Sequence, residues 1–197
     1  GNKANSPDAM LMLNQYRLNW DKGTADRLAT AFLHDPDKKV PFRIVHEGTA
    51  KRYLTGSDFD LESFQPIGDK FWIAEEFGPY LIRADKSGKV EAVFETMIDG
   101  KVARSPDHSA VVSPAIPGGT ANFNIRRTKG FEGMAASPDG RFLYALLEGP
   151  VWDTEKKDWE KTADGKEYLR ILEFDVANEK WTGRHWKYVL EENGLAI

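Results

Sequence analysis

Short apolar runs dominate the chain from residue 70 onward. They are rich in aromatic and β-branched residues, which is typical of strands. The runs are Phe71–Glu75, Tyr80–Ala84, Val90–Phe94, Phe142–Leu147, Tyr168–Phe174 and Trp186–Leu190. Turn sequences such as Gly-Asp, Ser-Gly and Asp-Gly separate them, and these residues favour reversals of the chain. The pattern predicts an all-β fold.

The first fifty residues follow a different pattern. Their apolar positions fit neither a helical nor a strand period, so residues 1–50 are expected to form an irregular N-terminal segment packed on the strand-rich part, residues 51–197. Two intervals within that part, 98–129 and 151–167, are too long for hairpin loops. We expect them to cover a site or to cross between blade-like units.

An internal repeat is the strongest sign of organisation. The segment from Glu62 to Pro79 parallels that from Glu132 to Pro150: each has a leading Glu, a Pro-x-Gly turn, an aromatic pair, a closing Glu and a Gly-Pro exit. Glu76 and Glu148 are the closing residues. Because another strand follows each unit, we expect four-stranded meanders, as in a β-propeller blade. Propeller strand ends converge on one axis, so these acids would face one another. Shared turn chemistry with solvated acids is the alternative.

A second acidic pattern overlaps the first copy. Asp58, Asp60 and Glu62 alternate with Phe59 and Leu61, and on a strand this spacing places the three carboxylates on one face. A cation would relieve their repulsion. Oxygen ligands without His or Cys favour a hard ion, calcium first and magnesium second, although the spacing is not that of an EF-hand. A solvent-facing acidic strand is the alternative.

Composition narrows the function classes. The chain has 197 residues, 41% of them hydrophobic and 12% aromatic, enough for a packed core. A net charge of −4 without a run of Lys or Arg argues against nucleic acid as a partner. No apolar stretch reaches the ~20 residues of a membrane span, and the first twenty residues lack a signal-peptide pattern. The absence of cysteine excludes disulfides and thiolate sites.

Other chemistries find little support in the sequence. It contains neither a Gly-x-Ser-x-Gly nor a His-Glu-x-x-His motif. His108 is interpreted as an exposed loop histidine, with a proton carrier as the alternative. Arg104, Arg126 and Arg127 could bind an anionic substrate through bidentate contacts. The tryptophans are expected in the core between blades, with Trp152 and Trp159 as exceptions.

Several of these motifs together resemble the phytase-like family, described as esterase-like activity of phytase. The resemblance rests on Val40-Pro-Phe, Leu54–Ser63, Phe71–Leu81, Arg104-Ser-Pro, Gly130–Gly140 and Leu147–Pro150. It implies a β-propeller, a periplasmic or secreted location and hydrolysis of phosphate or other esters with a metal. Members of the family usually run longer, so the chain resembles part of a propeller that would need its remaining blades or an oligomer partner. The element around Glu132 is also similar to a metal-ligating motif of gluconolactonase-like propellers.

These observations combine into one hypothesis, metal-assisted hydrolysis of a small anionic phosphate ester. Calcium would be held by Asp58, Asp60, Glu62, Glu132 and Glu148. Glu76, Arg104 and Arg127 would act on the substrate, the arginines by neutralising developing negative charge. Two alternatives stay open: a propeller that binds a ligand or partner without catalysis, and a calcium-dependent carboxylester or lactone hydrolase.

Overall fold

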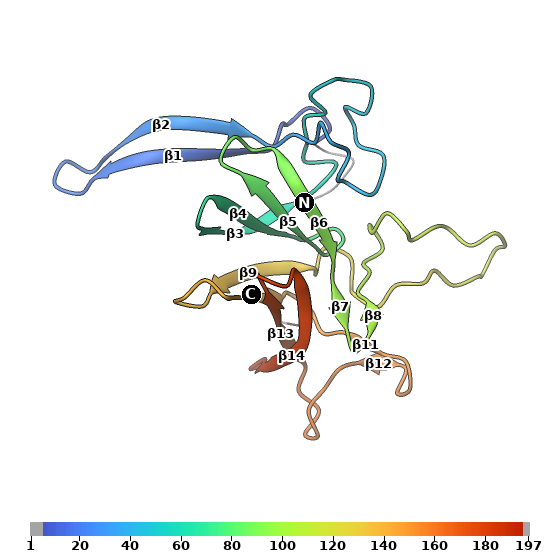
Figure 1. Cartoon of the computed structure of the whole chain (residues 1–197). Helices are drawn as coiled ribbons and strands as arrows, with labels where there is room; N and C mark the ends of the chain where they lie inside the picture. Colours follow the sequence, from blue (N-terminus) through green and yellow to red (C-terminus); the bar gives the residue numbers. More distant parts are fainter. Residues whose placement is uncertain (1–5, 195–197) are drawn as a thin grey trace.

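The computed structural model describes residues 6–194, in which all regular elements are β-strands. Two four-stranded antiparallel sheets dominate the molecule (Figure 1). The first consists of β3 (Leu61–Ile67), β4 (Lys70–Glu75), β5 (Tyr80–Asp85) and β6 (Val90–Glu95); the second consists of β9 (Phe131–Ala136), β10 (Phe142–Leu147), β13 (Tyr168–Asp175) and β14 (Lys180–Val189). Both follow chain order, as blades do, and the all-β prediction is confirmed. Residues 6–194 do not close a ring.

The two sheets meet along their first strands, β3 and β9. Gln65 on β3 donates a side-chain hydrogen bond to the carbonyl oxygen of Met134 on β9, at 2.8 Å. A shared apolar core fills the space between the sheets and includes Trp72, Leu81 and Phe174, all nearly free of solvent contact. Burial of this core holds the two sheets at a fixed position relative to each other.

The opposite face of the first sheet is also buried. On β4, Trp72 and Ala74 face the second sheet, whereas Ile73 belongs to a separate core. Leu33 of the N-terminal segment and Phe59, which lies just before β3, cover that face, and neither has exposed surface. Strands covered on both faces read as continuous apolar runs, which explains why β4 and β5 were predicted correctly.

The N-terminal segment also contains a feature that the sequence pattern did not predict. Strands β1 (Met12–Asn19) and β2 (Thr24–Phe32) pair as a long hairpin that extends away from the two sheets (Figure 1). Most of its residues are exposed, so no buried face imposes the usual alternation. Trp20 is 86% exposed and Trp186 on β14 is 47% exposed, so the expectation of tryptophan only at the core is wrong for both.

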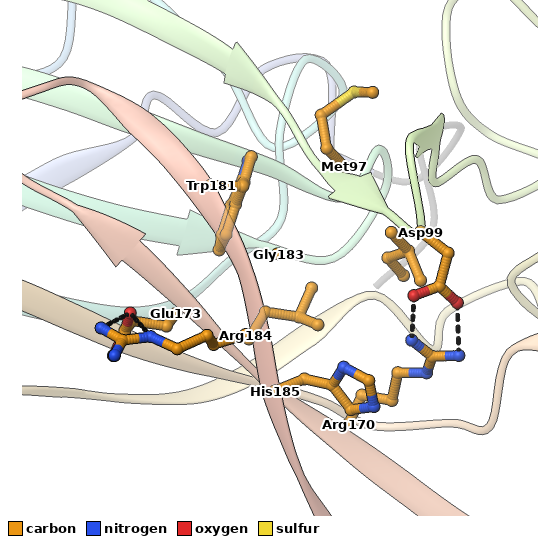
Figure 2. A pocket seen from close by; sticks show the side chains of 10 residues that line it. Met97, Asp99, Arg170, Glu173, Trp181, Gly183, Arg184 and His185 are labelled. Atoms are coloured by element: carbon orange, nitrogen blue, oxygen red, sulfur yellow. Dashed lines mark hydrogen bonds and ion pairs between the residues drawn. The ribbon is translucent and has the colours of Figure 1, made fainter.

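The two long intervals contain small hairpins. Strands β7 (Met97–Ile98) and β8 (Lys101–Val102) pair with each other, as do β11 (Trp152–Asp153) and β12 (Asp158–Trp159). Arg170 on β13 joins the two intervals, because its guanidinium forms two hydrogen bonds with Asp99, at 2.7 and 3.0 Å (Figure 2), and others with Glu160. These contacts fix the intervals to the second sheet.

Candidate metal-binding site

Three carboxylates gather where β3 begins and β4 ends. Asp60 directly precedes β3, Glu62 lies in β3, and Glu76 directly follows β4. Each offers one oxygen, and these oxygens lie within 4.8 Å of one another. The backbone N–H of Glu76 donates to the carbonyl oxygen of Asp60 at 2.9 Å. Two neighbouring strand ends thus bring together residues sixteen positions apart in the sequence.

A β-bulge places Glu62 in this group. Leu61 pairs with Glu75 and Ser63 pairs with Ala74, so Glu62 is the extra residue on β3. Bulges interrupt the alternation of a strand and re-aim the side chain that they contain. The irregular pairing is therefore part of the site and not a defect of the sheet.

The second copy of the repeat has the same local structure. Phe131 pairs with Leu147 and Met134 pairs with Ala145, so Glu132 and Gly133 stand opposite a single residue of β10. Both leading glutamates therefore lie in bulges of the first strand of their sheet. Glu148 directly follows β10, as Glu76 follows β4. The sequence repeat corresponds to a structural repeat.

The acids of the two sheets influence one another electrostatically. Burial raises the pKa of Glu62, and the charges of Asp60, Glu132 and Glu148 raise it further. Burial likewise raises the pKa of Glu132, with a further increase from the charge of Glu148. Like charges within reach of one another each disfavour ionisation of the others. The predicted convergence of Glu62 and Glu132 is consistent with this coupling.

Glu76 has the largest shift of the group. Burial raises its pKa to about 7, and a hydrogen bond and the charge of Asp60 act in the same direction. Only 5% of the residue is exposed. Full ionisation of the cluster at neutral pH is thus costly without a counter-charge, and an all-oxygen donor set is what a hard cation prefers.

Asp58 serves the local loop instead of this group. Its Oδ1 accepts a hydrogen bond from Val45 N at 2.8 Å, and its Oδ2 accepts bonds from Thr55 N and Oγ1 at 2.7 and 2.9 Å. The expectation that Asp58, Asp60 and Glu62 share one strand is wrong, because Asp58 lies in a turn and β3 begins only at Leu61. Asp58 closes that turn from within.

Among residues 6–194, the side chains of Arg104 and Arg127 form no hydrogen bond or ion pair with the clustered acids. Arg127 is exposed and pairs with Asp107, whereas the backbone N–H of Arg104 donates to Asn124 Oδ1 at 2.7 Å. A cation that does lie beside these acids is Lys129, whose ammonium pairs with Glu148. Sequence reasoning missed Lys129, although its position three residues before the leading Glu132 of the second copy was a usable signal.

His108 is buried, contrary to its interpretation as an exposed loop histidine. Only 3% of the residue is exposed, and its ring stacks on Tyr80 at 4.9 Å between centroids. The N–H of Ala110 donates to its Nδ1 at 3.0 Å, and its Nε2 lies 3.5 Å from a carboxylate oxygen of Glu95. These contacts fasten the base of the 98–129 interval to the first sheet.

A small pocket lies elsewhere, between β14 and the β7–β8 hairpin. Met97, Arg170, Trp181 and His185 are among its lining residues (Figure 2). Its volume of about 10 Å³ holds at most about one water molecule. None of the carboxylates predicted as ligands lines it, so it is not the candidate site.

The fold and the acidic cluster define an all-β protein with blade-like sheets and a site suited to a hard cation. Comparison with known proteins identifies its family: the model of the phytase-like family, esterase-like activity of phytase, matches residues 1–197, and the chain belongs to that family. It is 28% identical over 117 residues to an uncharacterized secreted protein of Arthroderma benhamiae.

That match covers 54% of this chain and 22% of the relative. The chain therefore corresponds to only a fraction of the length of this relative. No solved structure gives a significant match. Within residues 6–194, no helix is long and apolar enough to cross a membrane.

Proposed function

We propose that this chain carries the metal site of an esterase-like hydrolase that acts on a small anionic phosphate ester. The observation that carries the proposal is the group of Asp60, Glu62 and Glu76, whose ligand oxygens lie within 4.8 Å of one another. The description of the family, esterase-like activity of phytase, supports the reaction class. The relative from Arthroderma benhamiae is described as a secreted protein, which supports a periplasmic or extracellular location.

The residues at the site fit a divalent cation. Asp60, Glu62 and Glu76 would hold it, with Glu132 next in reach on the neighbouring sheet. Both ions bind carboxylate oxygens. Calcium is the first choice because it accepts a variable number of oxygen ligands in flexible geometry, and magnesium is the second because it requires a nearly octahedral arrangement. When bound, such an ion acts as a Lewis acid on a phosphoryl or carbonyl oxygen and lowers the pKa of water.

The remaining roles belong to side chains of the chain itself. The bulge at Glu62 fixes the direction of the Glu62 side chain, and Lys129 positions Glu148 through an ion pair. Arg104 and Arg127 lie on the interval that joins the sheets and are proposed to meet the anionic group of the substrate. Arg127 would exchange its partner Asp107 for that group, which its exposed position allows.

Calorimetric titration with calcium tests the site. Glu62→Gln should lower calcium affinity at least tenfold, because it removes a charged ligand, while Glu155→Gln, at an exposed acid outside the cluster, should leave the affinity unchanged. An intact sheet signal in circular dichroism would show that both variants fold. Unchanged affinity in a folded Glu62→Gln variant would remove Glu62 from the site.

A substrate screen tests the reaction. Phytate, a phosphomonoester, a phosphodiester, a p-nitrophenyl carboxylester and a lactone would each be offered with calcium and with chelator. Calcium-dependent turnover of the phosphate esters is expected. Turnover of only the carboxylester or lactone would assign the chain to that class of hydrolase. Calcium binding without turnover of any of the five would favour a binding protein.

A further inference from the structure

Lys129 brings a positive charge into the acidic cluster. Its ammonium pairs with the carboxylate of Glu148, and the two side chains are 28% and 10% exposed. The same charge opposes the rise in the pKa of Glu132 that burial and Glu148 cause. Lys129 therefore acts on both acids of the second repeat.

The backbone around Lys129 is shaped to place this side chain. Thr128 has a φ of 51°, in the left-handed region that non-glycine residues rarely adopt. On the facing segment, a Cβ at Gly149 would lie 2.8 Å from Cβ and 3.3 Å from Cγ of Lys129. Glycine at 149 leaves the room that the stem of the lysine occupies.

The two copies of the repeat differ at this point. Counting back from the leading glutamate, the first copy has Asp60 and Phe59 where the second has Gly130 and Lys129. Phe59 is fully buried in the core on the far side of the first sheet. The first copy thus adds a third acid to its pair, whereas the second adds a cation to its pair.

We propose that Lys129 is a tethered cation that occupies the second half of the acidic cluster, so that the exchangeable metal ion binds only in the first half. The inference rests on the proposed function, because it assigns the ion to Asp60, Glu62 and Glu76. The ammonium of Lys129 compensates Glu148 and lessens the negative potential at Glu132. Lys129 thereby limits each chain to one exchangeable ion and directs that ion to the first half of the cluster, so it is a positioning residue.

Calcium titration of Lys129 variants tests the inference. Lys129→Gln should bind calcium at least tenfold more tightly or bind a second ion, because the positive charge paired with the Glu148 carboxylate has been removed. Lys129→Arg keeps the charge and should bind like the natural chain. Lys156→Gln, at a lysine whose side chain is 73% exposed and pairs with Asp153, is the control and should not change the affinity. Thermal unfolding in chelator shows which variants fold.

The outcomes separate this inference from the proposed function. If folded Lys129→Gln binds calcium no more tightly than the natural chain and with the same number of ions, the tethered cation is wrong. If the natural chain binds no calcium but Lys129→Gln does, Lys129 is confirmed as the internal cation and the proposed natural metal site fails. If Lys156→Gln tightens calcium binding as much as Lys129→Gln does, the effect is one of net charge and the inference is overturned.

Discussion

Gly130 lies directly against the backbone of Glu76. A Cβ at Gly130 would stand 2.1 Å from the carbonyl oxygen of Glu76 and 2.7 Å from its carbonyl carbon. The contact joins the chain entering β9 to the chain leaving β4, so it connects the acids of the two repeats. It also explains why the second copy cannot carry an aspartate where the first carries Asp60.

Gly130→Ala should therefore separate the two halves of the site. The methyl group cannot fit, and the shift of the backbone should cost about 1–3 kcal/mol of unfolding free energy and weaken calcium binding. Urea denaturation and calorimetry measure the two effects. Gly133→Ala, in the same strand with nothing within 4 Å of its Cβ, is the control. Equal effects of the two substitutions would show that the contact with Glu76 is unimportant.

The raised pKa of Glu76 predicts a pH dependence of stability without metal. Its folded pKa of about 7 lies above the ordinary value of 4.5, so the neutral carboxyl favours the folded state. That stability is fully present below pH 4.5 and is lost as the pH rises through 7. In the Glu76→Gln variant, the decrease in unfolding free energy with rising pH should be smaller by about 1–3 kcal/mol. Denaturation in chelator between pH 5 and pH 8 measures it.

Calcium should reverse the same loss, since an ion that binds only the folded state stabilises it by mass action. The unfolding free energy of the natural chain at pH 8 should therefore rise on adding calcium, and that of Glu155→Gln should rise equally. If the unfolding free energies of the natural chain and of Glu76→Gln change in parallel with pH in chelator, the assigned pKa of Glu76 is wrong.

Asp58 should matter for stability and not for the metal. Asp58→Ala leaves three donors without their acceptor: the backbone N–H and hydroxyl of Thr55, which are buried, and the partly exposed N–H of Val45. The expected cost is about 2–4 kcal/mol of unfolding free energy, with Asp58→Asn less severe because one oxygen remains. Chemical denaturation measures the cost. A tenfold loss of calcium affinity in folded Asp58→Asn would return Asp58 to the set of ligands.

Arg170 should hold the long intervals in place. Its side chain is 7% exposed and pairs with Asp99 and Glu160, so Arg170→Met leaves a largely buried carboxylate at Glu160 without this partner. We expect a loss of about 2–4 kcal/mol in unfolding free energy and faster proteolysis within residues 98–129 and 151–167. Arg27→Met, at an exposed position of β2, is the control. Unchanged proteolysis of Arg170→Met would show that the clamp is dispensable.

Strands were predicted correctly where burial imposes a pattern on the sequence. Strands such as β4 and β10 are enclosed by other elements, and their apolar runs were sufficient to find them. The hairpin of β1 and β2 is mostly exposed, and its sequence carried no comparable signal. Asp58 was misassigned because the same alternation of acids and apolar residues suits either a strand or a turn that closes on its own aspartate.

The sequence by itself determined the all-β class, the repeat and the identity of the acids, because strand periodicity and repeated turn residues are local properties of the chain. Only the tertiary structure decided which acids meet and which cation joins them. That choice depends on two bulges and on the contact of Gly130 with Glu76. Bulges and close backbone contacts are set by pairing between distant segments, and a pattern of neighbouring residues does not contain them.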